Sequence, residues 1–365
     1  MTPYRFVFVV EQTLGHVAHS RNLERTLAER PDVEATLIKL AYGGGRLSRL
    51  PLLRNWSLRA SWKARRALRR RLASGPADAV FIHTQVSSLM AVGVMRRVPT
   101  VVSLDATPEN FDAEGAAYGH ARRSDLVEQL KKRINRRSLT AAQAIVTWNR
   151  WARSSLVVHY EIPVTKVTVI PPGVETEVFR PAQRSPGGRV RVLFVGGDLV
   201  RKGGTDLLEA MRGLGDVAEL DLVTGSEPPA LPAGLVCRVH RGLGPQSPRL
   251  VDLYRSADVF CLPSRGDCFP QAIAEAMACG LPVVATEVGA VGEAVLHGVN
   301  GLVVPPGSPA DLRLALEALI RDSDLRRSMG ERGLEIARRE HDARRNAEAI
   351  LELMAACSRA REPVA

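Results

Sequence analysis

The sequence lacks several features that mark whole classes of protein. Its 365 residues include five cysteines, and these form no CxxC pair and have no nearby histidine at the spacing of zinc ligands. No apolar run reaches about eighteen residues, the length that predicts a transmembrane helix. Internal repeats and low-complexity segments are also missing. These absences argue against a zinc module and a membrane-spanning protein.

The amino-terminal segment MTPYRFVFVVEQ has one arginine, a short apolar run and no small-residue cleavage site. This pattern predicts a first buried strand rather than a signal peptide. The cysteines are accordingly expected to be reduced thiols. A cytoplasmic location is the simplest expectation from both observations.

The net charge of +11 is concentrated in the first half of the chain. Residues 1–180 contain 28 Lys and Arg against 15 Asp and Glu, which gives +13, and the remainder contains 22 against 24, which gives −2. An anionic partner is therefore expected at the first half, either lipid or nucleic acid. The basic stretches lack aromatic stacking positions on strands and a known recognition motif, so no nucleic acid is expected.

Two basic helices are predicted in this half, over 57–73 and 125–138. In the first, one stripe is apolar (Ala60, Ala64, Leu68 and Leu72) and another is basic, and Trp56 and Trp62 lie near its start. In the second, Leu126, Leu130 and Ile134 are expected to face inward, with Lys131, Lys132, Arg136 and Arg137 outward. Basic residues beside tryptophan suit a peripheral position on the cytoplasmic face of an anionic membrane, and a solvated arginine face is the alternative.

The fold class predicted from the pattern is α/β, with two doubly wound parallel sheets. Strands are expected at 5–10, 34–39, 79–83, 100–105, 144–147 and 167–172, and again at 190–195, 220–223, 236–240, 258–263, 282–285 and 301–304. A Pro/Gly/Ser-rich linker over 181–188 separates the two sets. The predicted domains are 1–180 together with the C-terminal helix 343–365, and 181–342.

The most informative run is ADVFCLPSRGDCFPQAIAEAMACGLPVV over 257–284, which predicts a strand, a loop, a helix and a second strand. Amides at a helix start attract phosphate. Asp267 and Glu275 flank these amides and would repel phosphate, so they are better suited to hold hydroxyls. Backbone amides that bind phosphate, together with carboxylates that bind the hydroxyls of a polyol, are suited to a sugar nucleotide. A capped helix with a solvated glutamate is the alternative.

At these residues the chain resembles the retaining glycosyltransferases of family 4, which have the GT-B fold. The phrase PSRGDCFPQAIAEAMACGLPVVAT matches a family pattern of two glutamates separated by seven residues, here Asp267 and Glu275. The phrase KVTVIPPGVETEVFRP matches the family's domain-boundary phrase. In the loop after strand 190–195, Lys202 matches the family lysine, Gly197 stands where an arginine is usual, and Arg201 could supply the missing charge.

The resemblance implies two Rossmann-like domains that face each other across a cleft, with the donor on the second domain and the acceptor on the first. It implies metal-free transfer with retention from a nucleoside-diphosphate sugar, and no cofactor, to a hydroxyl of a lipid-linked, polysaccharide or small-molecule acceptor. The residues expected to act in catalysis are His83, Asp267 and Lys202, with His16 as the competitor of His83. The expected donor contacts are Gly196, Gly197, Arg201, Lys202, Asp267, Phe269, Pro270, Gln271 and Glu275, and the expected acceptor contacts are Gly15, His16, Asp105 and Thr107.

Two other functions fit parts of the pattern. A nucleotide-sugar epimerase of the same fold would consume its substrate without an acceptor. A non-catalytic membrane-binding module with a decayed site is suggested by Gly197, Asp267 and the basic first half. The presence of Lys202 and Glu275 argues against decay.

Overall fold

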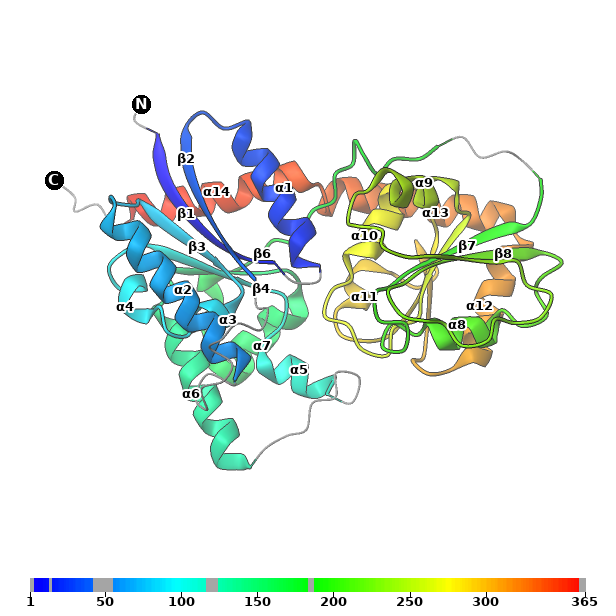
Figure 1. Ribbon diagram of the computed structural model, residues 1–365, viewed down its shortest axis with the longest axis horizontal. Coiled ribbons are helices and arrows are strands. Elements are labelled where there is room, and N and C mark those ends of the chain that lie inside the picture. Colours follow the sequence, from blue (N-terminus) through cyan, green and yellow to red (C-terminus); the bar gives the residue numbers. More distant parts are fainter. Residues whose placement is uncertain (1–2, 13–14, 42–54, 116–123, 183–186, 361–365) are drawn as a thin grey trace. The chain divides into compact units, whose positions relative to one another are not determined.

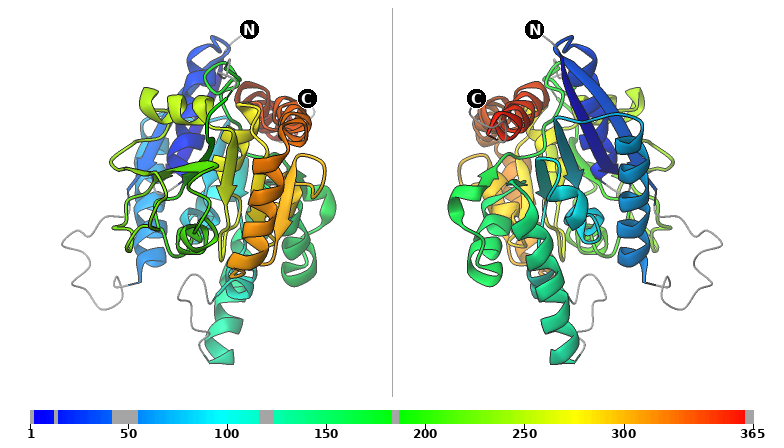
Figure 2. Two further views of the ribbon diagram at one scale, coloured as in Figure 1. Left: turned by 90° about the vertical axis from the view of Figure 1, so that its right-hand side faces the viewer. Right: turned by 90° about the vertical axis from the view of Figure 1, so that its left-hand side faces the viewer.

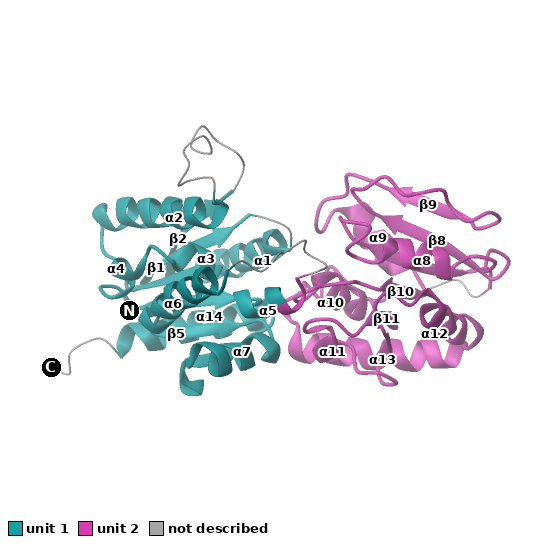
Figure 3. Cartoon of the chain, turned by 90° about the horizontal axis from the view of Figure 1, so that it is seen from below, with its two compact units in different colours: residues 1–112, 121–172, 344–365 teal, residues 113–120, 173–343 magenta. Residues whose placement is uncertain are grey.

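The computed structural model describes residues 3–12, 15–41, 55–115, 124–182 and 187–360. The chain divides into two compact units, which Figure 3 shows in different colours. Unit 1 comprises residues 1–112, 121–172 and 344–365, and unit 2 comprises residues 113–120 and 173–343. The break between the units at 172 and 173 precedes the proline-rich stretch at which the sequence predicts a boundary.

Unit 1 is built on a six-stranded sheet in the order β2-β1-β3-β4-β5-β6, and every pairing is parallel. Its strands are β1 Tyr4–Glu11, β2 Val33–Leu40, β3 Ala79–His83, β4 Thr100–Leu104, β5 Ala144–Thr147 and β6 Val167–Val169. Because β1 has β2 on one side and β3 on the other, the chain reverses its winding direction at this strand (Figure 1). Ligands of such sheets bind beyond the carboxyl ends of the strands at that reversal.

Helices cover both faces of the unit 1 sheet. Alternate residues of β1 enter two separate cores, with Val7 and Val9 in one and Phe6 and Phe8 in the other. The helices of this unit are α1 His16–Ala28, α2 Trp56–Ala73, α3 Gln85–Ser88, α4 Val92–Met95, α5 Pro108–Ala113, α6 Asp125–Ala141, α7 Arg150–Tyr160, the 3-10 turn η3 Val164–Lys166 and α14 Ala343–Arg359. Helix α14, near the end of the chain, packs with α1 in the core that contains Phe6 and Phe8.

Unit 2 repeats this architecture with the strand order β12-β11-β10-β7-β8-β9, again all parallel. Its strands are β7 Val190–Val195, β8 Ala218–Val223, β9 Cys237–His240, β10 Val259–Leu262, β11 Val283–Thr286 and β12 Gly301–Val304. Its helices are α8 Gly204–Ala210, α9 Pro248–Ser256, α10 Gln271–Ala278, α11 Val291–Ala294, α12 Pro309–Arg321 and α13 Ser323–Glu340.

The predicted α/β class with two doubly wound parallel sheets is confirmed, and all twelve expected strands are present. The predicted stripe of α2 is also confirmed in large part, because Ala60, Ala64 and Leu68 are buried. Among the residues that the structure describes, none of the helices combines the length and the apolar character needed to cross a bilayer.

The predicted orientation of α6 is wrong. Leu126, Leu130 and Ile134 were expected to face inward, but their side chains are 79%, 58% and 40% exposed. The buried residues of α6 are Asn135, Ser138 and Leu139, in its second half. The first half projects beyond the rest of unit 1 (Figures 1 and 2), so its apolar stripe has no core to enter. A sequence period identifies an apolar face but not what covers it.

Candidate active site

In unit 2, three loops meet at the carboxyl ends of β7, β10 and β11. The loop after β7 ends at Gly203, whose φ is +72°. A Cβ added to Gly203 would lie 1.8 Å from the carbonyl oxygen of Pro263, at the end of β10. A Cβ on Gly289, in the loop after β11, would lie 1.9 Å from the carbonyl oxygen of Asp267. Only glycine allows these loops to approach so closely.

Lys202 and Asp267 form an ion pair where these loops meet. The Lys202 ammonium contacts Asp267 Oδ2, and both side chains are largely buried. Ser264 Oγ donates a second hydrogen bond to Asp267 Oδ2 at 3.2 Å. Gly196 lies against the stem of Lys202, where an added Cβ would come within 2.8 Å of the lysine Cβ. The structure therefore brings Gly196, Lys202 and Asp267 together, as the sequence predicts.

Arg201 lies beside the loop that carries Asp267, because its Nη1 donates to the carbonyl oxygen of Gly266 at 3.0 Å. Gly197 is exposed, and a Cβ built on it meets no atom within 4 Å. The site thus holds two cationic side chains from the β7 loop and has open space at the position of the family arginine. Two cations can balance a diphosphate, which carries about two negative charges.

Glu275 is buried in α10, one helix beyond the Asp267 loop. The hydroxyl of Tyr254, on α9, donates to its Oε2 at 2.8 Å. Burial raises the pKa of Glu275 to about 7, and the hydrogen bond from Tyr254 acts in the opposite direction. The sequence pointed to Glu275 but not to Tyr254, because a contact over 21 positions leaves no local signal.

The remaining predicted donor residues surround the start of α10. Pro270 is the residue before its first turn, Gln271 begins the helix, and no side chain caps it. Phe269 is buried, and its ring lies 5.5 Å from that of His341. The amide of Gly289 donates to Glu114 Oε1 at 3.0 Å, so a carboxylate from residues 113–120 already binds a backbone amide in this part of unit 2.

In unit 1, the predicted histidines lie together at the carboxyl edge of the sheet. His16 lies at the start of α1 and His83 at the end of β3. The distance from His16 Nδ1 to His83 Nε2 is 2.7 Å. His83 Nδ1 lies 3.2 Å from Ser103 Oγ, and its ring stacks on Trp148 with centroids 5.0 Å apart. His83 is fully buried, whereas His16 is half-buried. Both candidates therefore belong to one cluster, and His16 is its accessible member.

Burial disfavours the charged forms of His83 and His19. It holds the pKa of His83 well below its ordinary value, with the neighbouring His16 and His19 acting in the same direction. Burial likewise lowers the pKa of His19 to about 3. Trp148 Nε1 and His19 Nε2 are both buried without a hydrogen-bond partner among the described residues. The sequence missed Trp148 and His19, which lie on separate elements.

The predicted acceptor residues differ in accessibility. Asp105 is partly exposed at the end of β4, and burial raises the pKa of its carboxyl while the nearby His16 lowers it. Gly15 is exposed and has φ of −62°, which any residue can adopt. Thr107 is fully buried, and its hydroxyl lies 2.6 Å from Ser155 Oγ. The structure thus brings His16 and Asp105 together and leaves Thr107 in the protein interior.

Comparison with known proteins gives two matches to family models, one for each half of the chain. Residues 15–178 match the model described as "Glycosyltransferase Family 4", and residues 189–322 match "Glycosyl transferases group 1". Among solved structures, sucrose-phosphate synthase from Thermosynechococcus elongatus superposes with a TM-score of 0.77 and 18% identity, covering 98% of this chain and 100% of that one. The Anabaena protein HepE, solved with UDP and glucose, gives a TM-score of 0.66 at 16% identity and covers 97% and 100%.

The curated relatives include proteins named D-inositol 3-phosphate glycosyltransferase from several organisms. That of Kribbella flavida is 36% identical over 50% of this chain and 49% of its own length. That of Paenarthrobacter aurescens is 30% identical over 70% of this chain and 67% of its own length. The match with the Kribbella flavida protein spans about half the length of that relative. The architecture is that of the GT-B fold, and the chain belongs to glycosyltransferase family 4.

Proposed function

We propose that this chain transfers a sugar, with retention of its anomeric configuration, from a nucleoside-diphosphate sugar to a hydroxyl acceptor. The observation that carries the proposal is the meeting of Lys202, Arg201 and Asp267 where the β7, β10 and β11 loops touch through Gly203 and Gly289. Support for this donor class comes from HepE, whose solved structures contain UDP and UDP-glucose. The names of the curated relatives support glycosyl transfer.

In this proposal unit 2 holds the donor. Lys202 and Arg201 contact the diphosphate, and the amides at the start of α10 add to the grip. Glu275 accepts hydrogen bonds from the ribose hydroxyls, and Asp267 accepts from the donor sugar. As the bond from the sugar carbon to the phosphate oxygen breaks, negative charge grows on the diphosphate, and the two cations stabilise it.

The acceptor binds unit 1 at the carboxyl edge of its sheet. The acceptor oxygen forms its bond to the sugar carbon on the face from which the diphosphate departs, and its proton passes to the leaving phosphate oxygen. His16 contacts the acceptor, and His83 acts as a positioning residue, because it is fully buried and its Nε2 lies 2.7 Å from His16 Nδ1. Asp105, close to His16, accepts a hydrogen bond from the acceptor.

A peripheral position on the cytoplasmic face of an anionic membrane also belongs to this proposal. Helices α2 and α6 both carry arginines on unit 1, and the first 180 residues have a net charge of +13 from 28 basic and 15 acidic residues. Basic surfaces of this kind are attracted to anionic headgroups.

Replacement of Lys202 tests the diphosphate contact. We expect Lys202→Ala to lower kcat/KM about 10- to 100-fold, because a charge-assisted hydrogen bond contributes about 1.5–3 kcal/mol. Lys39→Ala is the matched control, since Lys39 is half-exposed and paired with Glu24 on unit 1. Initial rates of sugar transfer measure the effect. Full activity in Lys202→Ala would remove the diphosphate assignment.

A gain of affinity is expected from Gly197→Arg. The position has open space for a side chain and is not among the glycines with positive φ, so an arginine fits without strain. It would add a third cation to the diphosphate grip and lower the donor Kd about tenfold. Gly197→Gln, which adds a polar but uncharged side chain, is the control in calorimetric titrations. Equal effects of the two substitutions would show that charge is not responsible.

The pKa of Glu275, about 7, predicts a pH-dependent donor affinity. An ionised carboxylate accepts hydrogen bonds from ribose more strongly than a neutral carboxyl does, so affinity should rise as pH increases through about 7 and then level off. Glu275→Gln should remove this rise. Tyr254→Phe should move it to higher pH, because the lost hydrogen bond stabilises the ionised form. Identical pH profiles for wild type and Glu275→Gln would contradict the assignment.

The metal-free, retaining mechanism is tested with an α-linked donor and proton NMR of the product. We expect an α-linked product, formed at an unchanged rate after chelation by EDTA, because Lys202 and Arg201 supply the charge that a metal would otherwise supply. A β-linked product would refute retention, and loss of turnover on chelation would refute the metal-free mechanism. Consumption of donor without any acceptor, giving an epimer, would indicate an epimerase instead.

A further inference from the structure

Helix α6 turns its apolar stripe toward the surface. Leu126, Leu130 and Ile134 follow one another at intervals of four residues and therefore lie along one side of the helix. Their exposed fractions fall from 79% to 58% and 40% toward the end that packs on unit 1. Single exposed apolar residues are common, but a row of three on one helix marks a surface that contacts something else.

The attachment of α6 to unit 1 explains why this row stays outside. Ser138 Oγ lies 2.6 Å from Ser88 Oγ of α3, and both serines are buried. Asn135 is buried with its amide bonded to the carbonyl oxygen of Lys131 at 2.9 Å. The inward face of α6 is thus short and mostly polar, and it lies in the second half of the helix. Among the described residues, the first half of α6 is attached to unit 1 only through the second half of the same helix.

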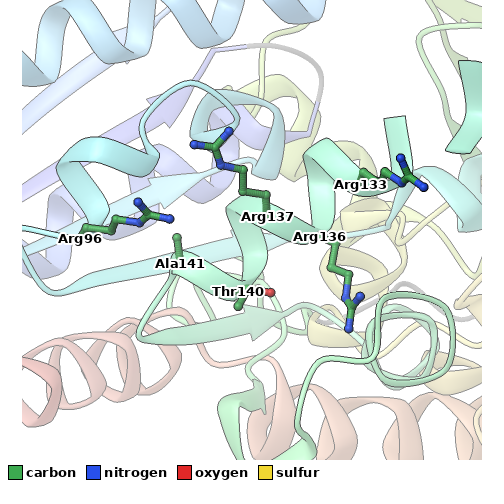
Figure 4. Close-up of a pocket in the computed structure, with 6 residues that line it drawn as sticks. All are labelled: Arg96, Arg133, Arg136, Arg137, Thr140 and Ala141. Carbon is green, nitrogen blue, oxygen red and sulfur yellow. The ribbon is translucent and has the colours of Figure 1, made fainter. Parts of the chain in front are cut away.

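Arginines surround the attached half of α6. Arg133, Arg136 and Arg137 extend from the helix in different directions, and Arg96 comes from the end of α4 (Figure 4). With Thr140 and Ala141 they line a pocket of about 520 Å³. A neighbouring pocket of about 280 Å³ shares Arg137 and adds Arg65 and Arg69 of α2. No acidic residue lines either pocket among the residues that the structure describes.

Most of this positive charge is not balanced. Within the described ranges, no carboxylate pairs with Arg65, Arg69, Arg133 or Arg137. Arg136 contacts Glu161, but both side chains are more than half exposed. An exposed ion pair contributes little to stability, so a phosphate can readily replace Glu161. The arginine pockets are therefore suited to bind phosphate groups, which guanidinium contacts through two parallel hydrogen bonds.

The combination of an apolar row and arginine pockets selects the partner. A nucleic acid would occupy the arginines and leave the apolar row in water. An anionic bilayer satisfies both features, because leucine and isoleucine enter the boundary of the acyl chains while arginines bind lipid phosphates. We propose that α6 lies in the headgroup layer of an anionic membrane, with Leu126, Leu130 and Ile134 inserted and the arginine pockets on lipid phosphates. This inference rests on the peripheral position proposed above.

Vesicle co-sedimentation tests the inference. We expect the full chain to bind vesicles of equal parts phosphatidylglycerol and phosphatidylcholine, to bind pure phosphatidylcholine weakly, and to dissociate as salt is raised. The triple variant Leu126→Ser, Leu130→Ser, Ile134→Ser should lose binding at least tenfold. Arg133→Gln with Arg137→Gln should lose about thirtyfold, since each arginine near an anionic surface contributes about fivefold.

Matched controls come from α12, where Leu314 is 65% exposed and Arg321 is 78% exposed at its side chain. Leu314→Ser and Arg321→Gln should bind vesicles as the wild type does. All altered side chains are at the surface, so unfolding transitions should be unchanged and loss of binding cannot be loss of fold. Wild-type binding by the triple variant, or equal binding to neutral and anionic vesicles, would overturn the inference.

Two further measurements separate other outcomes. Light scattering that shows a dimer in the wild type and a monomer in the triple variant would assign the row to a second copy of the chain. Binding of polyphosphate without binding of vesicles would assign the arginines to a free anion. Donor binding is measured in parallel by thermal shift with nucleoside-diphosphate sugars, so failure of the membrane surface is distinguishable from failure of glycosyl transfer.

Discussion

The proposed donor site of this chain depends on two backbone contacts that only glycine permits. Gly203 meets Pro263 and Gly289 meets Asp267, each at a distance where a Cβ would strike a carbonyl oxygen. The first contact brings the β7 loop against the end of β10, and the second brings the β11 loop against the same segment. These two contacts bring Lys202 next to Asp267, with which it forms an ion pair. Substitution of either glycine would separate the loops, and the ion pair with them.

Polar contacts hold the side chains of this site in place. Asp267 is bonded to Lys202 and Ser264, and Arg201 to the Gly266 carbonyl. A diphosphate that binds here meets a lysine already oriented, so little side-chain entropy is lost on binding. The cost appears elsewhere, because removal of Lys202 leaves a largely buried carboxylate without its cation. The same pair therefore supports both the loop and the proposed chemistry.

The sequence was sufficient to predict the sheets, since alternating strands and helices and their turn residues are local signals. Motif order also pointed to Lys202 and Asp267, which the structure pairs at neighbouring strand ends, and to Glu275, which it buries in α10. Contacts such as Tyr254 with Glu275 or Trp148 with His83 were not predictable, because each joins two elements through side chains with no shared pattern. The predicted orientation of α6 was wrong for a related reason, since an apolar face is buried only where other elements of the fold pack against it.

Glu275, a proposed ribose contact, shows how burial of a carboxyl can act against stability. Its pKa in the folded protein, about 7, lies above the ordinary value of 4.5. The folded state therefore holds a proton that the unfolded state has lost between these values, and stability falls as pH rises through that window, by about 3 kcal/mol in all. Among the described residues, the Tyr254 hydroxyl donates to this carboxyl and offsets only part of the effect of burial. In the proposed function, ribose hydroxyls donate further hydrogen bonds to this carboxylate and recover part of that loss.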